Sequence, residues 1–385
     1  MLNYFSSKFT LGILGGGQLG KMMLYDTRKY DIRTKVLDPS AEAPCRIACN
    51  TFVQGDLMDY KTVLDFAQDV DVLTIEIENV NVEALEKLEN DGKIVYPSAK
   101  TLKIIRDKGT QKTFYKNNNI ATSPFKCYNT KAELEADYKT NQFQLPIVWK
   151  SQTGGYDGRG VSILKSETDI ETLPDTPCLL EEKVNFKNEL AVIVTRSVSG
   201  DIKTYPVVEM EFHPIANQVE YVICPARISD EVSQKAQEVA RKVSEAYQHV
   251  GLLAVELFQT QDDEILVNEV APRPHNSGHY SIEGAYTNQF EQHIRAILDL
   301  PLGATNSKVG AVMVNLVGDE NHEGDVYYEN IDKIMGLKGV TPHIYGKAQT
   351  RPFRKMGHVT IVDKDLSKAR EIAEQVKGLI KVISR

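Results

Sequence analysis

The sequence has few cysteines, a single tryptophan and no long apolar run. Its five cysteines are scattered, and none belongs to a Cys-x-x-Cys pair, which excludes a disulfide scaffold and predicts free thiols. No segment approaches the roughly 18 consecutive apolar residues that a membrane span requires. The N-terminal residues lack the apolar core and cleavage site of a signal peptide. These absences predict a cytoplasmic protein with no membrane partner.

Basic residues are also fewer than acidic residues. Lys and Arg number 45 against 53 Asp and Glu, so the formal net charge is −8. An acidic total argues against a nucleic-acid partner, although it permits a local basic pocket for an anionic ligand. The hydrophobic fraction of 42% and the charged fraction of 25% are ordinary for globular domains. The length of 385 residues predicts two or three domains.

The order of strands and helices predicts a mixed fold. Short apolar strands alternate with helical stretches over residues 10–100, which indicates βαβ units and a parallel sheet. Residues 147–224 read as successive strands, an amphipathic helix follows over 230–250, and a single helix is expected near 99–118. The expected class is therefore α/β and α+β. The expected domains are 1–100 (α/β), 101–300 and 301–385 (C-terminal).

The first glycine-rich segment, Gly15–Gly20, reads G-x-G-x-x-G after a predicted strand and before a helix. With Asp38 about 20 residues further on, the pattern permits a nicotinamide-dependent oxidoreductase. The parallel pattern, however, spans only about 100 residues, too few for two complete mononucleotide-binding halves. A phosphate or substrate edge and a simple tight turn are the alternatives.

A second glycine-rich segment, TGGYDGRG at 153–160, lies between two predicted strands. Its backbone N–H groups could surround phosphates, and Lys150 at the end of the preceding strand could reach them. A mobile hairpin with a solvated Arg159 is the alternative.

Glu256 and Glu269 form the third candidate. If residues 261–264 form a hairpin turn, Glu256 lies directly opposite Glu269, and Phe258 lies opposite Val267. Like charges so placed destabilise a sheet unless they share a proton or bind a cation, and oxygen ligands suit Mg²⁺. The alternative is a hairpin slipped by one residue, with one carboxylate in solvent.

Two further segments concentrate polar groups. Residues 271–279, APRPHNSGH, carry donors suited to a small oxyanion next to the presumed metal. A basic cluster follows near the C-terminus and is either a solvated turn or a site for a phosphomonoester. Its members are Lys347, Arg351, Arg354, Lys355 and His358.

Taken together, these motifs resemble the ATP-grasp ligases, and within them the N5-carboxyaminoimidazole ribonucleotide synthetases of purine biosynthesis. The resemblance implies an ATP-grasp fold between an N-terminal parallel-sheet domain and a small C-terminal domain. It also implies ATP-dependent carboxylation of aminoimidazole ribonucleotide by bicarbonate through carboxyphosphate, with Mg²⁺, in a homodimer. The segments that carry it are ILGGGQLGKMM (13–23), TIEIENV (74–80), RDKGTQK (106–112), TGGYDGRG (153–160), NEVAPRPHNSGHY (268–280) and RPFRKMGH (351–358).

The resemblance also implies roles for individual residues. Those expected to bind ATP are Arg106, Lys150, Gly154, Gly155, Tyr156, Gly158, Gly160, Glu181, Glu182, Lys183, Val184, Glu189, His213 and Asn268. Glu256 and Glu269 match the metal ligands. The residues expected at the reacting groups are Asp157, Arg159, Arg273, His275 and Asn276, with Asp157 a proton acceptor. Those expected on the ribonucleotide are Gln18, Glu76, Tyr156, Lys347, Arg354 and Lys355.

The sequence departs from the family pattern at two positions. Phe353 stands where the family usually has Gly, and Ala271 replaces an Asn common after the second metal carboxylate. The competing functions are another ATP-grasp ligase that uses formate or an amino acid, a nicotinamide-dependent oxidoreductase built on Gly15–Gly20, and a non-catalytic nucleotide-binding module.

Overall fold

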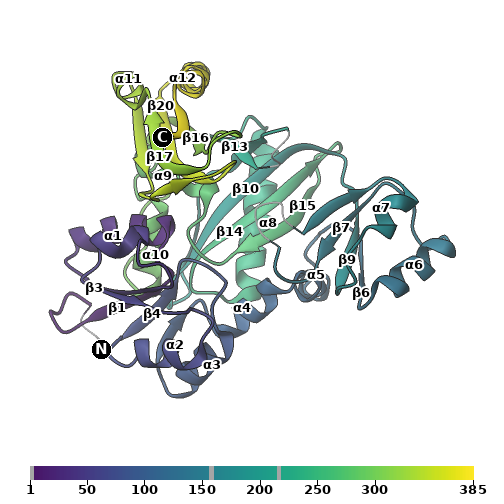
Figure 1. Ribbon diagram of the computed structural model, residues 1–385, viewed down its shortest axis with the longest axis horizontal. Helices are drawn as coiled ribbons and strands as arrows, with labels where there is room; N and C mark the ends of the chain where they lie inside the picture. Colours follow the sequence, from purple (N-terminus) through teal and green to yellow (C-terminus); the bar gives the residue numbers. More distant parts are fainter. Residues whose placement is uncertain (1–3, 156–159, 215–217) are drawn as a thin grey trace.

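The structure, a computed structural model, describes residues 4–155, 160–214 and 218–385. It contains a parallel sheet, a small antiparallel lobe and a long sheet that runs on into the C-terminal part (Figure 1). Four residues of the second glycine-rich segment, Tyr156, Asp157, Gly158 and Arg159, lie outside the described residues.

The N-terminal part is the expected parallel sheet, in the order β3-β2-β1-β4-β5. Its strands are β1 (Thr10–Leu14), β2 (Arg33–Asp38), β3 (Thr51–Gln54), β4 (Val72–Ile75) and β5 (Ile94–Tyr96). Its helices are α1 (Gln18–Lys29), α2 (Tyr60–Phe66) and α3 (Val82–Asn90), with a short 3-10 turn at Pro44–Ile47. Because β2 and β4 lie on opposite sides of β1, the chain reverses its direction of winding there. The residues that follow β1 and β4 therefore meet at one point.

The predicted helix near 99–118 is two helices, α4 (Ala99–Arg106) and α5 (Lys108–Asn117). They are divided at Asp107, whose backbone is extended and whose carboxylate accepts a hydrogen bond from the N–H of Thr110. An Asp in this position satisfies backbone donors that a continuous helix would not leave free, so it begins a new helix. The break turns α5 toward the small lobe.

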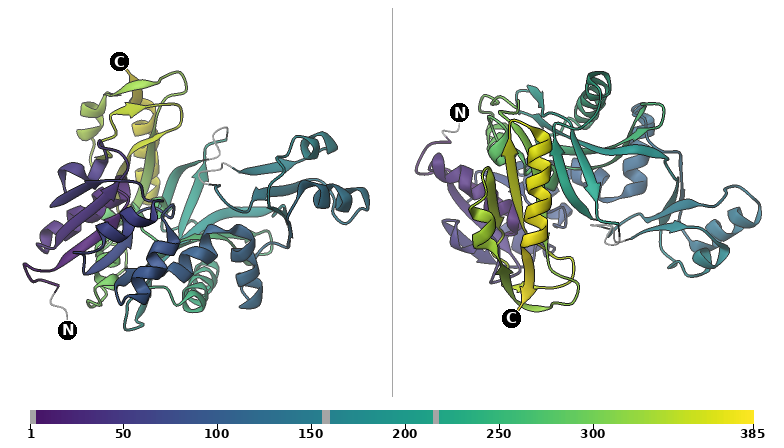
Figure 2. Two further views of the ribbon diagram at one scale, coloured as in Figure 1. Left: turned by 60° about the horizontal axis from the view of Figure 1, so that its bottom comes forward. Right: turned by 90° about the horizontal axis from the view of Figure 1, so that it is seen from above.

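The small lobe is an antiparallel sheet in the order β6-β9-β7-β8, with two helices beside it. It projects away from the rest of the molecule in all views (Figures 1 and 2). Its elements are β6 (Phe125–Tyr128), α6 (Lys131–Lys139), β7 (Ile147–Ser151), β8 (Val161–Leu164), α7 (Glu167–Glu171) and β9 (Cys178–Glu182).

The long sheet has the order β15-β14-β10-β12-β13-β16-β20-β18, with β11 paired to β10. Because β13 pairs with β16, the C-terminal strands extend the same sheet. The strands are β10 (Phe186–Arg196), β11 (Ile202–Thr204), β12 (Val208–Phe212), β13 (Val219–Cys224), β14 (Gly251–Thr260), β15 (Ile265–Ala271), β16 (Gly310–Val317), β18 (Val340–Ile344) and β20 (Lys355–Asp363).

Helix α8 (Asp230–Tyr247) covers one face of this sheet. Ser229 caps its first turn, and the stripe expected from the sequence is buried, with Ala236, Ala240 and Val243 each fully inaccessible. These residues pack on the inward side chains of β10 and β14. The opposite face of the same two strands buries Ile193, Leu252 and Ala254 in a second apolar cluster, and it carries Glu189 and Glu256 further along the strands.

The remaining elements close the molecule. Helix α10 (Gln289–Ile297) packs between α1 and β14, and α12 (Leu366–Leu379) packs on β16 and β20 (Figure 1). A three-stranded sheet, in the order β19-β17-β21, has no counterpart in the sequence analysis. The other elements are α9 (Ser281–Gly284), β17 (Gly324–Glu329), α11 (Ile331–Met335), β19 (Gln349–Thr350) and β21 (Lys381–Ser384). Among the described residues, no helix combines the length and apolarity needed to cross a membrane.

Candidate active site

A β-bulge places the two candidate metal carboxylates. Val255 pairs with Val270, but the next pair is Leu257 with Val267, so Glu256 alone lies opposite both Asn268 and Glu269. The buried side chains of β15 before and after the bulge are those of Val267 and Val270, three residues apart. A bulge of this kind re-aims side chains, and here it leaves both Asn268 and Glu269 outside the core.

The register expected for this hairpin is therefore wrong beyond the bulge. Phe258 lies opposite Leu266, and not opposite Val267, because the bulge shifts the pairing by one residue. Val267 and Ile265 face the core against α8, on the side of the sheet away from the carboxylates. Glu256 and Glu269 are nevertheless close, because the extra residue of the bulge leaves Glu269 opposite Glu256.

The electrostatics of this pair favour a cation. Lys108 forms an ion pair with Glu269, and its charge holds the pKa of that carboxyl well below the usual range. Burial, together with the charges of Glu269 and Glu189, raises the pKa of Glu256. Nε2 of His275 lies 3.5 Å from Oε1 of Glu256. Among the described residues, Glu269 is thus paired with a lysine, whereas Glu256 forms no ion pair with a Lys or Arg side chain.

A second cluster joins the small lobe to the long sheet. Nζ of Lys150 lies 3.1 Å from Oε2 of Glu181 and 3.1 Å from Oδ1 of Asn268. Nζ of Lys112 lies 3.3 Å from the same oxygen of Glu181, to which the hydroxyl of Ser123 also donates, at 2.9 Å. One buried carboxylate therefore compensates two ammonium groups, and the excess positive charge lies next to Glu269.

Lys108 and Lys112 are functional candidates that the sequence analysis missed. Both come from RDKGTQK, a segment in which only Arg106 is singled out as a ligand. Their spacing of four residues places them on one face of α5, and this signal was present in the sequence. The expected Arg106 donates a hydrogen bond from Nη1 to the carbonyl of Val80, at 2.7 Å. Its contact with phosphate stays a prediction.

Other residues expected at the nucleotide lie around this cluster. Gly154 and Gly160 both have positive φ, and Gly155 follows Gly154 at the edge of the described part of the loop. Glu189 on β10 faces the carboxylate pair, and burial raises its pKa to about 7. Glu182 ends β9, and Lys183 and Val184 follow it. Their contacts with a nucleotide stay predictions.

The segment after β15 brings its polar side chains to the same place. Nε of Arg273 donates to Oε2 of Glu78, from the N-terminal part, at 2.9 Å. Asn276 and Asn315 exchange two amide hydrogen bonds, of 2.8 and 2.9 Å. The ring of His275 is held by the hydroxyl of Ser277, 2.9 Å from Nδ1. This segment therefore connects three parts of the molecule beside the carboxylate pair.

The first glycine-rich turn already holds an anion, the carboxylate of Glu76. Its two oxygens accept hydrogen bonds from the backbone N–H groups of Gly17, at 2.9 Å, and of Leu19 and Gly20, both at 3.2 Å. A Cβ at position 17 would lie 2.4 Å from Oε1 of Glu76, so only glycine allows this approach. The carboxylate of Asp38 accepts from the N–H of Gly16, at 2.7 Å. The donors that a dinucleotide would use are thus already occupied.

Comparison with known proteins assigns the parts of this structure. Residues 8–106 match the ribonucleotide synthetase preATP-grasp domain, residues 113–290 the ATP-grasp domain, and residues 311–372 the phosphoribosylaminoimidazole carboxylase C-terminal domain. The chain is 39% identical over 356 residues to N5-carboxyaminoimidazole ribonucleotide synthase of Bacillus subtilis, with 91% of each chain covered. The chain belongs to the N5-carboxyaminoimidazole ribonucleotide synthase family.

Solved structures of the synthase family have the same fold. The N5-carboxyaminoimidazole ribonucleotide synthetase of Thermotoga maritima matches with a TM-score of 0.90 and 42% identity, covering 98% of this chain and 100% of that one. The synthase of Aspergillus clavatus, solved with ADP and 5-aminoimidazole ribonucleotide, matches with a TM-score of 0.87 and 32% identity, covering 96% and 98%. The expected ATP-grasp fold is confirmed, and the oxidoreductase alternative is wrong.

The C-terminal basic cluster of this synthase is only partly a charged surface. Nζ of Lys347 donates to the carbonyl of Lys355, and Nη1 of Arg354 to that of Gln349, both at 2.7 Å. His358, expected among the positive charges, is fully buried. Its ring stacks between those of His279 and His343, and burial keeps its pKa well below the usual range, so it is neutral.

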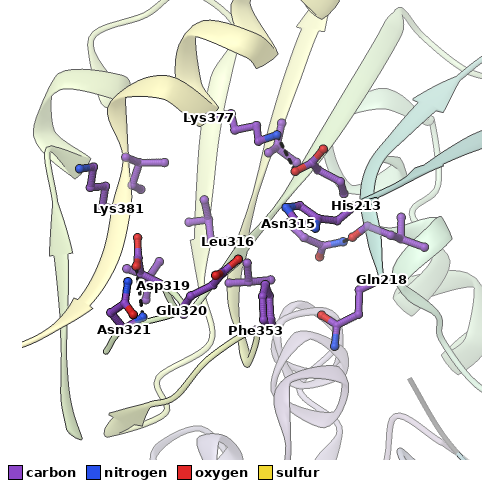
Figure 3. Close-up of a pocket in the computed structure, with 17 residues that line it drawn as sticks. His213, Gln218, Asn315, Leu316, Asp319, Glu320, Asn321, Phe353, Lys377 and Lys381 are labelled. Carbon is purple, nitrogen blue, oxygen red and sulfur yellow. Dashed lines mark hydrogen bonds and ion pairs between the residues drawn. The ribbon is translucent and has the colours of Figure 1, made fainter. Parts of the chain in front are cut away.

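His213, expected near the nucleotide, lies at the junction with the C-terminal strands. It lines a cavity of about 380 Å³ at the start of β13, the end of β16 and the C-terminal end of α12, together with Asn315 and Phe353 (Figure 3). Its ring centroid is 6.0 Å from that of Phe353, which has a φ of 59°. Glycine adopts a left-handed φ more readily than Phe does, which agrees with the glycine that the family pattern predicts at position 353. The contact of His213 with ATP stays a prediction.

Proposed function

We propose that this chain catalyses the reaction of its family, the ATP-dependent carboxylation of 5-aminoimidazole ribonucleotide by bicarbonate to N5-carboxyaminoimidazole ribonucleotide in purine biosynthesis. One observation carries the proposal beyond the family likeness. Asn268, which accepts a hydrogen bond from Lys150 of the small lobe, lies on the same β-bulge as Glu269 and shortly before Arg273–Asn276, the segment proposed to bind the oxyanion. Phosphoryl transfer to a small oxyanion requires these three elements side by side.

ATP lies, in this proposal, between the small lobe and the long sheet. Lys108 and Lys150 contact its phosphates, and the strand end at Glu181–Val184 lies along the adenine. Glu189 accepts a hydrogen bond from the ribose. The A. clavatus synthase that binds ADP supports this placement because its fold is the same. Arg106, His213 and the loop residues Gly154–Gly160 are proposed as further contacts with ATP.

Glu256 and Glu269 are the proposed Mg²⁺ ligands, and the donor set fits the ion. Within the described ranges, no group of three or more His, Cys, Asp or Glu side chains could hold a metal, so the cation needs phosphate oxygens and water as well. In the part of the chain that the structure describes, Glu256 forms no ion pair with a Lys or Arg side chain, and a cation would supply the compensating charge. When bound, Mg²⁺ neutralises charge on the transferred phosphoryl group.

The protein residues then act on two successive steps. Arg273, His275 and Asn276 hold bicarbonate while one of its oxygens attacks the γ-phosphorus and ADP leaves, which gives carboxyphosphate. The exocyclic amine of the ribonucleotide next attacks the carboxyl carbon. A C–N bond forms, the C–O bond to phosphate breaks, and inorganic phosphate and one proton are released. Asp157 is the proposed proton acceptor. The protein contributes position and electrostatic stabilisation in a site closed to water.

The ribonucleotide is proposed to lie between the N-terminal and C-terminal parts. Lys347, Arg354 and Lys355 hold its 5′-phosphate, and Gln18 and Glu76 line its other side. Tyr156, Asp157 and Arg159 reach it from the loop. We also propose that the chain is a cytoplasmic homodimer with domains 1–100, 101–300 and 301–385. The continuous sheet across β13 and β16 implies that the last two domains move as one body.

The decisive experiment measures ADP release from Mg-ATP while bicarbonate or aminoimidazole ribonucleotide is omitted in turn. We expect release to depend on both, and the product to be acid-labile N5-carboxyaminoimidazole ribonucleotide. Release that requires formate or an amino acid in place of bicarbonate would show a different ATP-grasp ligase. Nucleotide binding without any turnover would show a non-catalytic module.

A further inference from the structure

Helix α10 is buried yet carries polar side chains on its inward faces. Gln289, Gln292 and His293 are each fully inaccessible to solvent. Each of them bonds backbone atoms of another segment. Gln289 contacts His275, Gln292 contacts Gly303, and Nδ1 of His293 accepts from the N–H of Leu252. A buried polar group must be satisfied, so these contacts fix the segments to which they are made.

The side-chain amide of Gln289 holds the backbone of His275 by bonding both its N–H and its carbonyl group. Its Oε1 accepts from the N–H of His275 at 2.9 Å, and its Nε2 donates to the carbonyl of His275 at 2.8 Å. A Cβ on Gly278 would lie 2.3 Å from Oε1 of Gln289, so the loop closes tightly around the amide. The amide thus replaces the pairing that a neighbouring β-strand would provide.

His279 determines which way this amide points. Its Nδ1 lies 2.9 Å from Nε2 of Gln289, and burial together with neighbouring positive groups keeps its pKa well below the usual range. A neutral His279 can accept the second hydrogen of the amide nitrogen. If the amide were reversed, its oxygen would face the carbonyl of His275. All three contacts are satisfied only in the observed orientation.

The two hydrogen bonds between Gln289 and the backbone of His275, which we call the Gln289 clamp, also affect the ring of His275. The N–H of Ser277 lies 3.3 Å from Nδ1 of His275, which makes Nδ1 an acceptor and leaves the proton on Nε2. Nε2 in turn faces Glu256 at 3.5 Å. A rotation of the His275 backbone would turn this nitrogen away from the carboxylate pair. The backbone position of His275 therefore decides what its ring can reach.

We infer that Gln289 is a positioning residue for carboxyphosphate formation, because it fixes His275 at the bicarbonate site without touching a reactant itself. This inference rests on the proposed function. It assigns a role to a helix that lies outside the motifs of the sequence analysis. Loss of the clamp weakens the use of bicarbonate and leaves the use of ATP largely intact.

Gln292 provides a matched control within the same helix. It makes the same pair of contacts to one residue, accepting from the N–H of Gly303 at 2.8 Å and donating to its carbonyl at 3.0 Å. Gly303 lies in the connection before β16 and not in the active site. Gln289→Met and Gln292→Met therefore remove the same chemistry, at equal burial, from a catalytic and from a non-catalytic segment.

The test compares steady-state kinetics of both variants, with bicarbonate varied at saturating ATP and ribonucleotide, and then with ATP varied. We expect Gln289→Met to lower kcat/KM for bicarbonate by about ten- to a hundredfold, the scale expected for a misplaced catalytic group. Its kcat/KM for ATP should stay close to that of the wild type. Gln292→Met should change neither value. Equal effects of the two variants on bicarbonate, or equal losses for bicarbonate and ATP in Gln289→Met, would overturn the inference.

A second variant covers the case in which Gln289→Met does not fold. Gly278→Ala displaces the amide and should produce the same selective loss for bicarbonate; an ATP-directed loss would again refute the role. Failure of the wider proposal is distinguishable, because the wild-type enzyme would then show no dependence on bicarbonate at all. A bicarbonate-dependent wild type with insensitive Gln289 and Gly278 variants would refute the positioning role alone.

Discussion

Replacement of Glu181 by Gln should destabilise the protein strongly, although the two side chains have the same shape. The carboxylate is 3% exposed, and it compensates Lys112 and Lys150, whose residues are 2% and 8% exposed. Burial lowers the pKa of Lys112 to about 8, whereas the two lysines hold the pKa of Glu181 below its usual range. Lys112 is thus close to losing its proton even with its partner present. The neutral amide would leave Lys112 and Lys150, two buried ammonium groups, without the carboxylate that they share.

The expected cost is about 3–5 kcal/mol, the range for removing one partner of a buried ion pair. Lys112→Met alone should cost much less, because Glu181 keeps Lys150 as its partner. In the double variant, the methionine removes one of the two unpaired charges. Part of the cost of Glu181→Gln should then be recovered, so the two effects are not additive.

This double-mutant cycle can be measured by urea unfolding of the nucleotide-free protein at pH 7.5. The four proteins compared are the wild type, the two single variants and the double variant. The deficit of Glu181→Gln should also shrink between pH 7 and pH 9, because Lys112 loses its proton more readily without the carboxylate. The reasoning is refuted if Lys112→Met is the more destabilising single change, or if the two costs simply add.

Three further predictions follow from the same structure. Burial lowers the pKa of His249 to about 4, so as the pH falls from 6.5 to 4 the unfolded chain binds this proton before the folded protein does. This residue alone should lower the free energy of unfolding by up to about 1.4 kcal/mol per pH unit, and His249→Leu should reduce the slope in urea titrations by that amount; the buried His279, His293 and His358 contribute to the slope that remains. Arg354→Ala should raise KM for the ribonucleotide far more than KM for ATP, and an equal effect in the control Arg351→Ala would contradict the phosphate assignment. Glu269→Gln, like chelation of Mg²⁺, should abolish ADP release. Because the substitution also removes the partner of Lys108, the melting temperature of the ligand-free protein should fall while the protein stays folded; activity in either case would contradict the metal assignment.

The sequence was sufficient for features that depend on local patterns. Alternating strands and helices over residues 10–100 predict the parallel sheet that the structure contains, and the buried stripe of α8 follows from its period of 3.6 residues. The motifs at 153–160 and 268–280 led to the correct family because their residue types are specific in combination. These signals are local, so they survive without knowledge of long-range contacts.

The sequence was insufficient where pairing between strands decides the geometry. The bulge at Asn268–Glu269 adds one residue to one strand, and no residue type in the hairpin predicts its position. Without the bulge, Glu269 and Asn268 would point to opposite faces of the sheet, and only one of them could enter the site. The division of the predicted helix at Asp107 was, by contrast, readable, because Asp is a preferred N-cap residue.

Glu76 shows why a glycine-rich turn is a weak guide to its ligand. The turn after β1 offers backbone donors at a helix N-terminus, and any anion of suitable size satisfies them. Here Glu76, which directly follows β4, places its carboxylate against these N–H groups. Burial raises the pKa of Glu76, while the hydrogen bonds from the N–H groups lower it. The same donors therefore serve the packing of α1 on the sheet. A dinucleotide phosphate could bind only if Glu76 withdrew, which would leave a buried carboxylate without its partners. The occupied turn separates this fold from dinucleotide-binding proteins more clearly than the glycine pattern does.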